Sequence, residues 1–327
     1  MMNSAVIGCI GAGRMGRGIA QCVAYAGHEI RLLDAKARDA AAFETFKADA
    51  LKEIEQALAS MAALGAFDAG VLPTILSRVS VWPLEDAAAA LTDVTLVFEG
   101  VPEVEDAKRD AFALFDAHAG DDAILASTTS TMLSTHLAKL TRHPERFLNA
   151  HWLNPAFLMP LVELSPADET SPETLSATKT FLESIGKVPI VCKASPGFIV
   201  PRIQALAMNE AARLVEEGVA SAEDVDKAVT YGFGLRFGVL GLLEFIDWGG
   251  GDILYYASNY LAKAFEDERF APPDIISENM EKGRIGLKSG AGFFDYAGVD
   301  VDAYREKRMA AFLVALKGAG LVRPPVA

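Results

Sequence analysis

The chain has 327 residues, of which 51% are hydrophobic, and a formal net charge of −14. This length can hold two domains with sizeable cores, and the acidic balance argues against a nucleic-acid partner, because phosphate backbones require a basic surface. No apolar run approaches the roughly 18 residues that span a bilayer, and residues 1–8 lack the basic start and apolar core of a secretory signal, so we expect a soluble cytoplasmic protein without a membrane partner.

The N-terminal part of the chain has the pattern of a dinucleotide-binding turn. An apolar strand at residues 5–10 is followed by a glycine-rich turn and by a helix over about residues 14–26. The turn reads Gly11, Ala12, Gly13, Arg14, Met15 and Gly16. Its first glycine permits the tight bend, the second lets the backbone approach a pyrophosphate, and the third lets the helix pack on the strand. The helix then directs free N–H groups and a positive dipole end at the phosphates.

A second predicted strand, residues 28–33, ends on Asp34. A carboxylate at this place can accept hydrogen bonds from the ribose hydroxyls of NAD and would repel the additional phosphate of NADP. Lys36 and Arg38 could serve such a phosphate, but solvated charges after a strand are the commoner case. We therefore predict NAD, and not NADP, as the cofactor.

Strands and helices continue to alternate after Asp34. The expected helices are residues 36–63, 85–91 and 104–119, and the expected strands are residues 79–82, 94–98 and 123–126. This alternation predicts an α/β fold with a doubly wound parallel sheet, whose ligands lie beyond the carboxyl ends of the strands. The polar clusters at 99–103 and 127–131 follow strands and should lie at that end.

Three further strands, at 147–150, 161–164 and 188–192, complete the first domain, and the pattern is mostly helical from Ile199 onward. We predict a dinucleotide-binding domain over residues 1–193 and an all-α C-terminal domain for substrate binding and dimerisation over residues 194–327. The glycine-rich residues 232–251 should turn sharply between helices.

Cys9, Cys22 and Cys192 lie in or beside apolar segments and show no paired spacing. This favours reduced core thiols over disulfides or a metal centre. We expect no metal site.

Seven motifs, in order along nearly the whole chain, resemble those of the 3-hydroxyacyl-CoA dehydrogenase family, which also includes carnitine and gulonate dehydrogenases. The motifs are residues 11–16, 99–103, 127–130, 151–155, 160–163, 196–200 and 286–294. The resemblance implies a two-domain NAD enzyme of fatty acid metabolism with a helical C-terminal domain that forms a homodimer.

The resemblance makes His151 the general base and Glu163 the carboxylate that hydrogen-bonds its other ring nitrogen. Oxidation of a secondary alcohol requires hydride transfer to the nicotinamide and removal of the hydroxyl proton, which a neutral imidazole can accept. A carboxylate partner fixes the tautomer and stabilises the imidazolium as it forms. A core histidine and a charge at a strand end are the structural alternatives.

Ser130 matches the family serine whose hydroxyl contacts the substrate oxygen and helps to polarise the carbonyl in the reverse direction. A helix N-cap is the alternative, and Thr129 or Thr131 could cap equally well.

Four further residues match family positions near the coenzyme. Glu103 and Lys108 match a pair beside the cofactor, and Asn154 and Lys288 match residues near the nicotinamide end. Each of the four could alone be an ordinary surface residue.

Thr128 and Pro201 depart from the family, which usually has asparagine at both positions. Because proline has neither an N–H group nor a polar side chain, Pro201 cannot make the hydrogen bond that an asparagine gives. The geometry of the bound substrate is therefore left open.

A further departure concerns CoA. Family members that act on acyl-CoA carry lysines in the helical excursion and the loop after it, whereas residues 57–76 contain no Lys or Arg. Arg236 could instead pair with the carboxylate of a smaller substrate, or be an exposed charge in a turn.

The sequence thus predicts NAD-dependent oxidation of an L-3-hydroxyacyl-CoA, nominally 3-hydroxybutyryl-CoA, to the 3-oxoacyl-CoA. The alternatives are a dehydrogenase of a non-CoA 3-hydroxy acid, such as a carnitine-like betaine or a sugar acid, and a catalytically silent NADH-binding structural protein.

Overall fold

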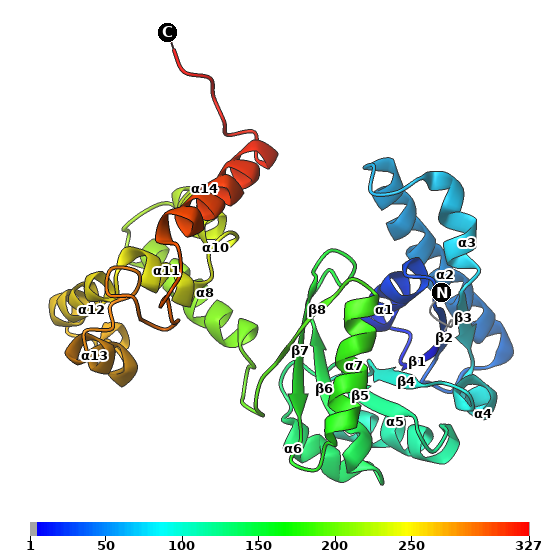
Figure 1. Cartoon of the computed structure of the whole chain (residues 1–327). Helices are drawn as coiled ribbons and strands as arrows, with labels where there is room; N and C mark the ends of the chain where they lie inside the picture. Colours follow the sequence, from blue (N-terminus) through cyan, green and yellow to red (C-terminus); the bar gives the residue numbers. More distant parts are fainter. Residues whose placement is uncertain (1–4, 327) are drawn as a thin grey trace. The chain divides into compact units, whose positions relative to one another are not determined.

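The structure of the protein is a computed structural model that describes residues 5–326. The chain folds into two compact units that divide between Ala207 and Met208, inside helix α8 (Val200–Glu216). The first unit holds a sheet with helices and the second is helical (Figure 1). The boundary at residue 193 between a dinucleotide-binding domain and a domain for substrate binding and dimerisation stays a prediction.

The described residues of the first unit form one sheet of eight strands in the order β3-β2-β1-β4-β5-β6-β7-β8. The strands are β1 (Val6–Ile10), β2 (Glu29–Leu33), β3 (Val79–Trp82), β4 (Leu96–Glu99), β5 (Ile124–Ser127), β6 (Phe147–Trp152), β7 (Leu161–Pro166) and β8 (Val188–Val191). The predicted α/β fold is confirmed, and each of these strands overlaps one expected from the sequence.

The sheet is mostly parallel, as predicted, with one exception: β6 and β7 are antiparallel. The connection between them, residues 153–160, has no helix of its own. A parallel pair needs a crossover of about a dozen residues or more, so a chain this short has to return antiparallel.

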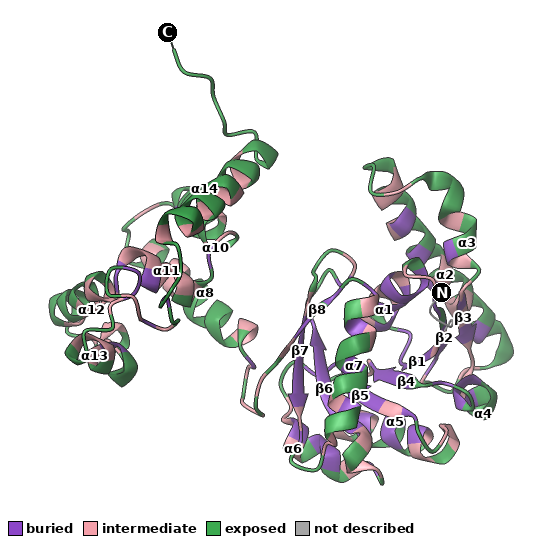
Figure 2. Ribbon diagram, in the orientation of Figure 1, coloured by how far each residue is buried: buried purple, intermediate pink, exposed green. Residues whose placement is uncertain are grey.

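Helices cover both faces of this sheet and bury two hydrophobic clusters within the described residues. The helices are α1 (Arg14–Tyr25), α2 (Ala40–Ala63), α3 (Leu72–Leu76), α4 (Ala87–Leu91), α5 (Glu105–His118), α6 (Ser134–Leu137) and α7 (Pro172–Ser184). Helices α1, α2 and α7 share one cluster, and α4, α5 and α6 share the other. Consecutive strand residues alternate between the clusters, as Leu32 and Leu33 do, because side chains alternate along a strand. Figure 2 shows the strands largely buried.

The second unit is helical, as predicted. After α8 it contains α9 (Ala222–Ala228), a π-helical turn (Val229–Gly234), α10 (Leu235–Phe237), α11 (Leu242–Gly249), α12 (Gly251–Phe265), α13 (Asp274–Glu281) and α14 (Val301–Gly318). Among residues 5–326 no single helix is long and apolar enough to cross a membrane, although the bent pair Ala222–Phe237 and Leu242–Gly249 passes that test by length and composition.

The expected sharp turns in residues 232–251 occur only in part of that segment. Gly232 and Gly234 lie in the π-helical turn, which continues α9 into α10. The chain turns at residues 238–241 and again at Gly250, whose φ of 112° favours glycine.

The motif at 286–294 forms a loop around Asp247, a buried residue of α11. The Asp247 carboxylate accepts hydrogen bonds from the N–H groups of Phe293 (3.0 Å) and Phe294 (2.9 Å). A Cβ on Gly292 would lie 2.0 Å from Asp247 Oδ1, and one on Gly286 would lie 2.2 Å from the Asp247 carbonyl oxygen. The glycines of this motif therefore have a packing role inside the second unit.

Candidate active site

The glycine-rich turn after β1 is shaped by close backbone packing at two of its glycines. Gly11 has a φ of 108°, and a Cβ there would lie 2.7 Å from the Gly100 carbonyl oxygen. A Cβ on Gly16 would lie 2.1 Å from the Gly11 carbonyl oxygen. Around a Cβ on Gly13, by contrast, no described atom lies within 4 Å, so the backbone is open to a ligand there.

The start of α1 fits a pyrophosphate. Its N-cap is Gly13, and no side chain in residues 5–326 caps the helix there, so the N–H groups of the first turn remain available to an anion. Ala12 is buried beside this turn, whereas Arg14 is exposed and Met15 is half-buried. When NAD is bound, it supplies the hydride acceptor.

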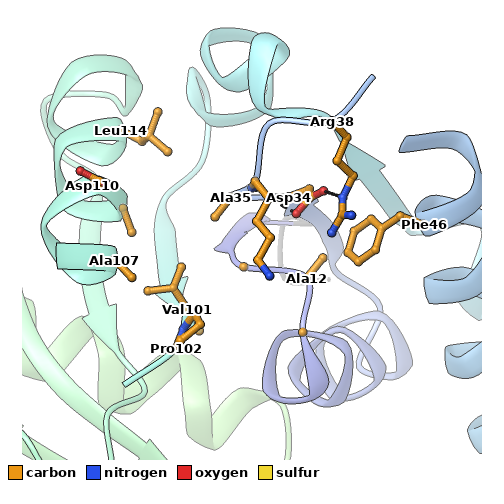
Figure 3. A pocket seen from close by; sticks show the side chains of 15 residues that line it. Ala12, Asp34, Ala35, Arg38, Phe46, Val101, Pro102, Ala107, Asp110 and Leu114 are labelled. Atoms are coloured by element: carbon orange, nitrogen blue, oxygen red, sulfur yellow. Dashed lines mark hydrogen bonds and ion pairs between the residues drawn. The ribbon is translucent and has the colours of Figure 1, made fainter. Parts of the chain in front are cut away.

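A cavity of about 460 Å³ extends from this turn between β2, α2 and α5 (Figure 3). Asp34 forms part of its wall; the carboxylate is buried, pairs with Arg38 Nε at 2.5 Å, and accepts a hydrogen bond from the Lys36 N–H at 3.2 Å. The Arg38 guanidinium also lies 4.3 Å from the centre of the Phe46 ring. Arg38 is therefore not the solvated charge that the sequence predicted. Lys36 is exposed, as a solvated charge would be.

Glu99, at the end of β4, is a buried carboxyl residue for which the sequence predicted no role. Its carboxylate accepts hydrogen bonds from Lys108 Nζ (2.9 and 3.1 Å), from Ser127 Oγ (2.6 Å) and from the Val101 N–H (2.8 Å). Lys108 is only 1% exposed and also lies 3.1 Å from Glu103 Oε2. The sequence signal that could have identified Glu99 is a carboxyl residue at the end of an apolar strand.

Glu103 holds the segment after β5 in place. Its Oε1 accepts hydrogen bonds from the N–H groups of Ser130 and Thr131, both at 3.0 Å, and from the Thr129 hydroxyl. Burial alone would raise the pKa of Glu103, but the hydrogen bond from Thr129 and the positive charge of Lys108 outweigh it and lower the pKa to about 2.

The Ser130 side chain is exposed, and its hydroxyl makes no hydrogen bond within residues 5–326. Thr129 Oγ1 instead accepts the hydrogen bond from the Met132 N–H (2.9 Å). The helix that follows, α6, has Leu133 at its N-cap and no side-chain cap within the described residues, so Ser130 is not an N-cap and its hydroxyl is free for a ligand.

The antiparallel pairing of β6 and β7 places His151 directly opposite Glu163. His151 Nδ1 lies 2.8 Å from Glu163 Oε2, and both side chains are buried. Directly opposed residues of an antiparallel pair project from the same face, which explains how residues twelve apart in sequence meet.

Glu163 and His151 also contact the start of α8. Glu163 Oε1 accepts hydrogen bonds from the N–H groups of Ile199 (2.9 Å) and Val200 (2.8 Å). The Phe198 ring stacks on the imidazole, with ring centres 4.9 Å apart and planes inclined by 4°. Phe198 lies in the motif at residues 196–200, but the sequence predicted no role for it.

Two family models match the chain in succession. The model of the 3-hydroxyacyl-CoA dehydrogenase NAD binding domain matches residues 6–195, and that of the 3-hydroxyacyl-CoA dehydrogenase C-terminal domain matches residues 197–296. The chain belongs to the 3-hydroxyacyl-CoA dehydrogenase family. The predicted family, the NAD cofactor and the assignment as an NAD-dependent dehydrogenase acting on a CH–OH group are confirmed.

Relatives in this family differ in the substrates that their names give. A 3-hydroxybutyryl-CoA dehydrogenase of Clostridioides difficile is 33% identical, over 88% of this chain and 98% of the relative. A 5-formyl-3-hydroxy-2-methylpyridine 4-carboxylate 5-dehydrogenase of Mesorhizobium japonicum is 31% identical, over 92% of this chain and 94% of the relative. The crystal structure of a 3-hydroxyacyl-CoA dehydrogenase from Archaeoglobus fulgidus gives a TM-score of 0.75 at 32% identity, covering 97% of this chain and all of that one.

The remaining positions compared with the family lie in three connecting segments and in helix α8. Asn154 is exposed in the connection after β6, and Lys288 is exposed in the loop of the second unit around Asp247. Thr128 is buried, and its N–H donates to the Glu99 carbonyl oxygen at 2.9 Å. Pro201 is the second residue of α8, a position in the first helical turn where a missing N–H group is tolerated.

Proposed function

We propose that the protein oxidises an L-3-hydroxyacyl-CoA, nominally 3-hydroxybutyryl-CoA, to the 3-oxoacyl-CoA, with His151 as general base and Glu163 as its partner. The observation that carries this proposal is the buried contact of 2.8 Å between His151 Nδ1 and Glu163 Oε2. It leaves His151 Nε2 without a hydrogen bond among the described residues, so this nitrogen can serve a ligand.

The pair is suited to accept a hydroxyl proton. Because Glu163 accepts a hydrogen bond, the imidazole carries its proton on Nδ1 and keeps the lone pair on Nε2. The carboxylate then stabilises the imidazolium that forms when Nε2 takes the proton. Ser130, whose hydroxyl is free of local contacts, would donate a hydrogen bond to the same substrate oxygen.

For the coenzyme, we propose that residues Gly11 to Gly16 hold the pyrophosphate and that Asp34 accepts hydrogen bonds from the ribose. Glu103 and Lys108 would act indirectly, by fixing the segment that carries Ser130. The roles of Asn154 and Lys288 near the nicotinamide follow from the family match alone.

A dehydrogenase of a non-CoA hydroxy acid is the second candidate. Residues 57–76 contain no Lys or Arg that could meet the phosphates of CoA, and one relative of this chain is named for a pyridine carboxylate substrate. Arg236 is exposed, with its guanidinium 4.7 Å from the Phe245 ring centre, and could pair with a substrate carboxylate. A silent structural protein would have no use for the His151–Glu163 pair.

We also propose a homodimer. In the described part of the second unit, α12 and α14 contain no fully buried residue, and Tyr260 and Val314 on these helices are each 71% exposed. Large exposed apolar surface of this kind is typical of an interface. A cytoplasmic location stays a prediction, since the relatives include mitochondrial enzymes such as that of Sus scrofa.

A substrate screen tests the proposed function. NADH absorbance is followed with acetoacetyl-CoA and 3-hydroxybutyryl-CoA beside free 3-hydroxybutyrate, carnitine and gulonate, using wild type and His151→Ala. We expect turnover with the CoA thioesters in the wild type and a loss of roughly 10²-fold or more in His151→Ala. Turnover with free acids only would select the second candidate, and NADH binding without turnover would select the silent protein.

A further inference from the structure

The carboxylate expected to read the coenzyme ribose is already paired with a cation. Asp34 Oδ2 lies 2.5 Å from Arg38 Nε, while Oδ1 accepts the Lys36 N–H. Asp34 is 4% exposed and lines the cavity. A ligand in the cavity therefore meets its carboxylate together with the neighbouring guanidinium (Figure 3). A carboxylate in such a pair still has lone pairs for ribose hydroxyls, but its repulsion of a second anion is weakened.

Arg38 is held in place at the wall of the cavity. Its guanidinium lies 4.3 Å from the centre of the Phe46 ring of α2, and both residues line the cavity together with Asp34. Only the Nε group of Arg38 has a hydrogen-bond partner within residues 5–326. The four N–H bonds of its two Nη groups are therefore available to a ligand.

The other charged residues around the cavity do not duplicate this arrangement. The lining contains one more cation, Lys36, which is exposed and contacts Asp34 only through its backbone N–H. It also contains Asp110 on α5, which adds negative charge. Arg38 is thus the cation that lies against the ribose-reading carboxylate.

We infer that Arg38 determines how strongly this protein discriminates between NADH and NADPH. With Arg38 present, a 2′-phosphate meets a neutralised carboxylate and up to four free guanidinium donors, so NADPH binds measurably beside NADH. Without Arg38, the same phosphate meets the unpaired charge of Asp34. The inference depends on coenzyme binding by the first unit and is independent of the substrate that is oxidised.

The test is a set of coenzyme titrations without substrate. Kd values for NADH and NADPH are measured by nicotinamide fluorescence, and those for ADP-ribose and its 2′-phosphate by calorimetry. For Arg38→Met we expect the Kd of NADPH to rise about tenfold or more, the scale of one lost charge-assisted contact, while the Kd of NADH stays within about threefold. Arg38→Gln, which keeps a donor for Asp34 but lacks the charge, should behave alike.

Two further variants complete the design. Lys47→Met is the matched control and should change the NADPH Kd less than about threefold, because this lysine of α2 is not among the residues that line the cavity. Asp34→Asn should tighten NADPH in the presence of Arg38. Thermal melting of each variant shows whether it is folded.

The inference is overturned if folded Arg38→Met and Arg38→Gln leave the NADPH Kd unchanged or lower it, or if the wild type binds ADP-ribose but not its 2′-phosphate. Since the titrations contain no hydroxyacyl substrate, a failure of the proposed oxidation would leave these results unaffected. Conversely, a failed selectivity test would not affect the substrate screen.

Discussion

At the scale of residues, the proposed chemistry depends on the imidazole of His151. His151→Ala should lower kcat by roughly 10² or more, because it removes the general base, while the Kd of NADH stays within about threefold. Steady-state kinetics and fluorescence titration measure the two quantities. A large loss of NADH affinity would contradict the assigned role, since His151 would then hold the coenzyme.

Glu163→Gln tests the partner of His151. It is informative because both oxygens of the Glu163 carboxylate accept hydrogen bonds. Oε2 faces the ring of His151 and Oε1 faces the N–H groups of Ile199 and Val200. A glutamine must turn its NH₂ group toward one of these donors, so both kcat and Tm should fall. A drop in kcat with an unchanged Tm would mean that the contact to α8 has little structural weight.

We expect Phe198 to be a positioning residue, because its ring stacks on the imidazole of His151 and fixes the plane of that ring. Phe198→Leu keeps an apolar side chain but removes the stacked ring, so kcat should fall about tenfold while the KM for NAD stays unchanged. Phe198→Tyr should restore the rate. A general loss of structure would move both parameters and would not be rescued by Tyr.

At the scale of elements, the carboxyl ends of β4 and β5 are joined by a buried charge network. Glu99 and Glu103 share Lys108, which lies on α5, and Glu103 reaches the backbone after β5. The cation compensates the buried carboxylate of Glu99, which would otherwise be costly, and also pairs with the partly exposed Glu103. The network thus orients the segment with Ser130 relative to α5.

Glu103→Gln tests this network through its pH dependence. The folded pKa of about 2 lies below the usual 4.5, so ionised Glu103 stabilises the fold fully above about pH 4.5, and this contribution is lost as the pH falls toward 2. The side chain is 35% exposed, so after allowance for screening we expect Glu103→Gln to lower the free energy of unfolding by about 1–2 kcal/mol at pH 7.

Urea unfolding at pH 7 and pH 3 measures the effect, which should be smaller at pH 3. Asp121→Asn, which changes an exposed carboxylate in the turn after α5, is the control and should leave the stability nearly unchanged at both values. An equal loss for Glu103→Gln at both pH values would mean that the charge of Glu103 does not stabilise the fold.

At the scale of the whole molecule, the apolar residues of the second unit predict self-association. Sedimentation should give a species of about twice 34.9 kDa, and dilution should lower Tm, since a bound partner stabilises the folded state. Val314→Glu should weaken the association because Val314 is exposed on α14. A monomer whose Tm is independent of concentration would contradict the homodimer.

Much of this molecule could be predicted before any coordinates. The glycines of the first turn, Asp34 at the end of a strand and the alternation of apolar strands with helices are local signals, because propensity and packing period act over a few residues. The direction of β7 could not be predicted in this way, since its apolar pattern is the same whether it runs parallel or antiparallel to β6.

The sequence by itself determined the fold class, the family, the coenzyme and the identities of the two residues proposed for proton transfer. Only the tertiary structure decided which side chains meet: Arg38 with Asp34, Phe198 with His151, and Lys108 with Glu99. The physical reason is that a motif specifies residue types along the chain, whereas a contact between separate elements depends on strand register and helix packing, which the whole fold sets.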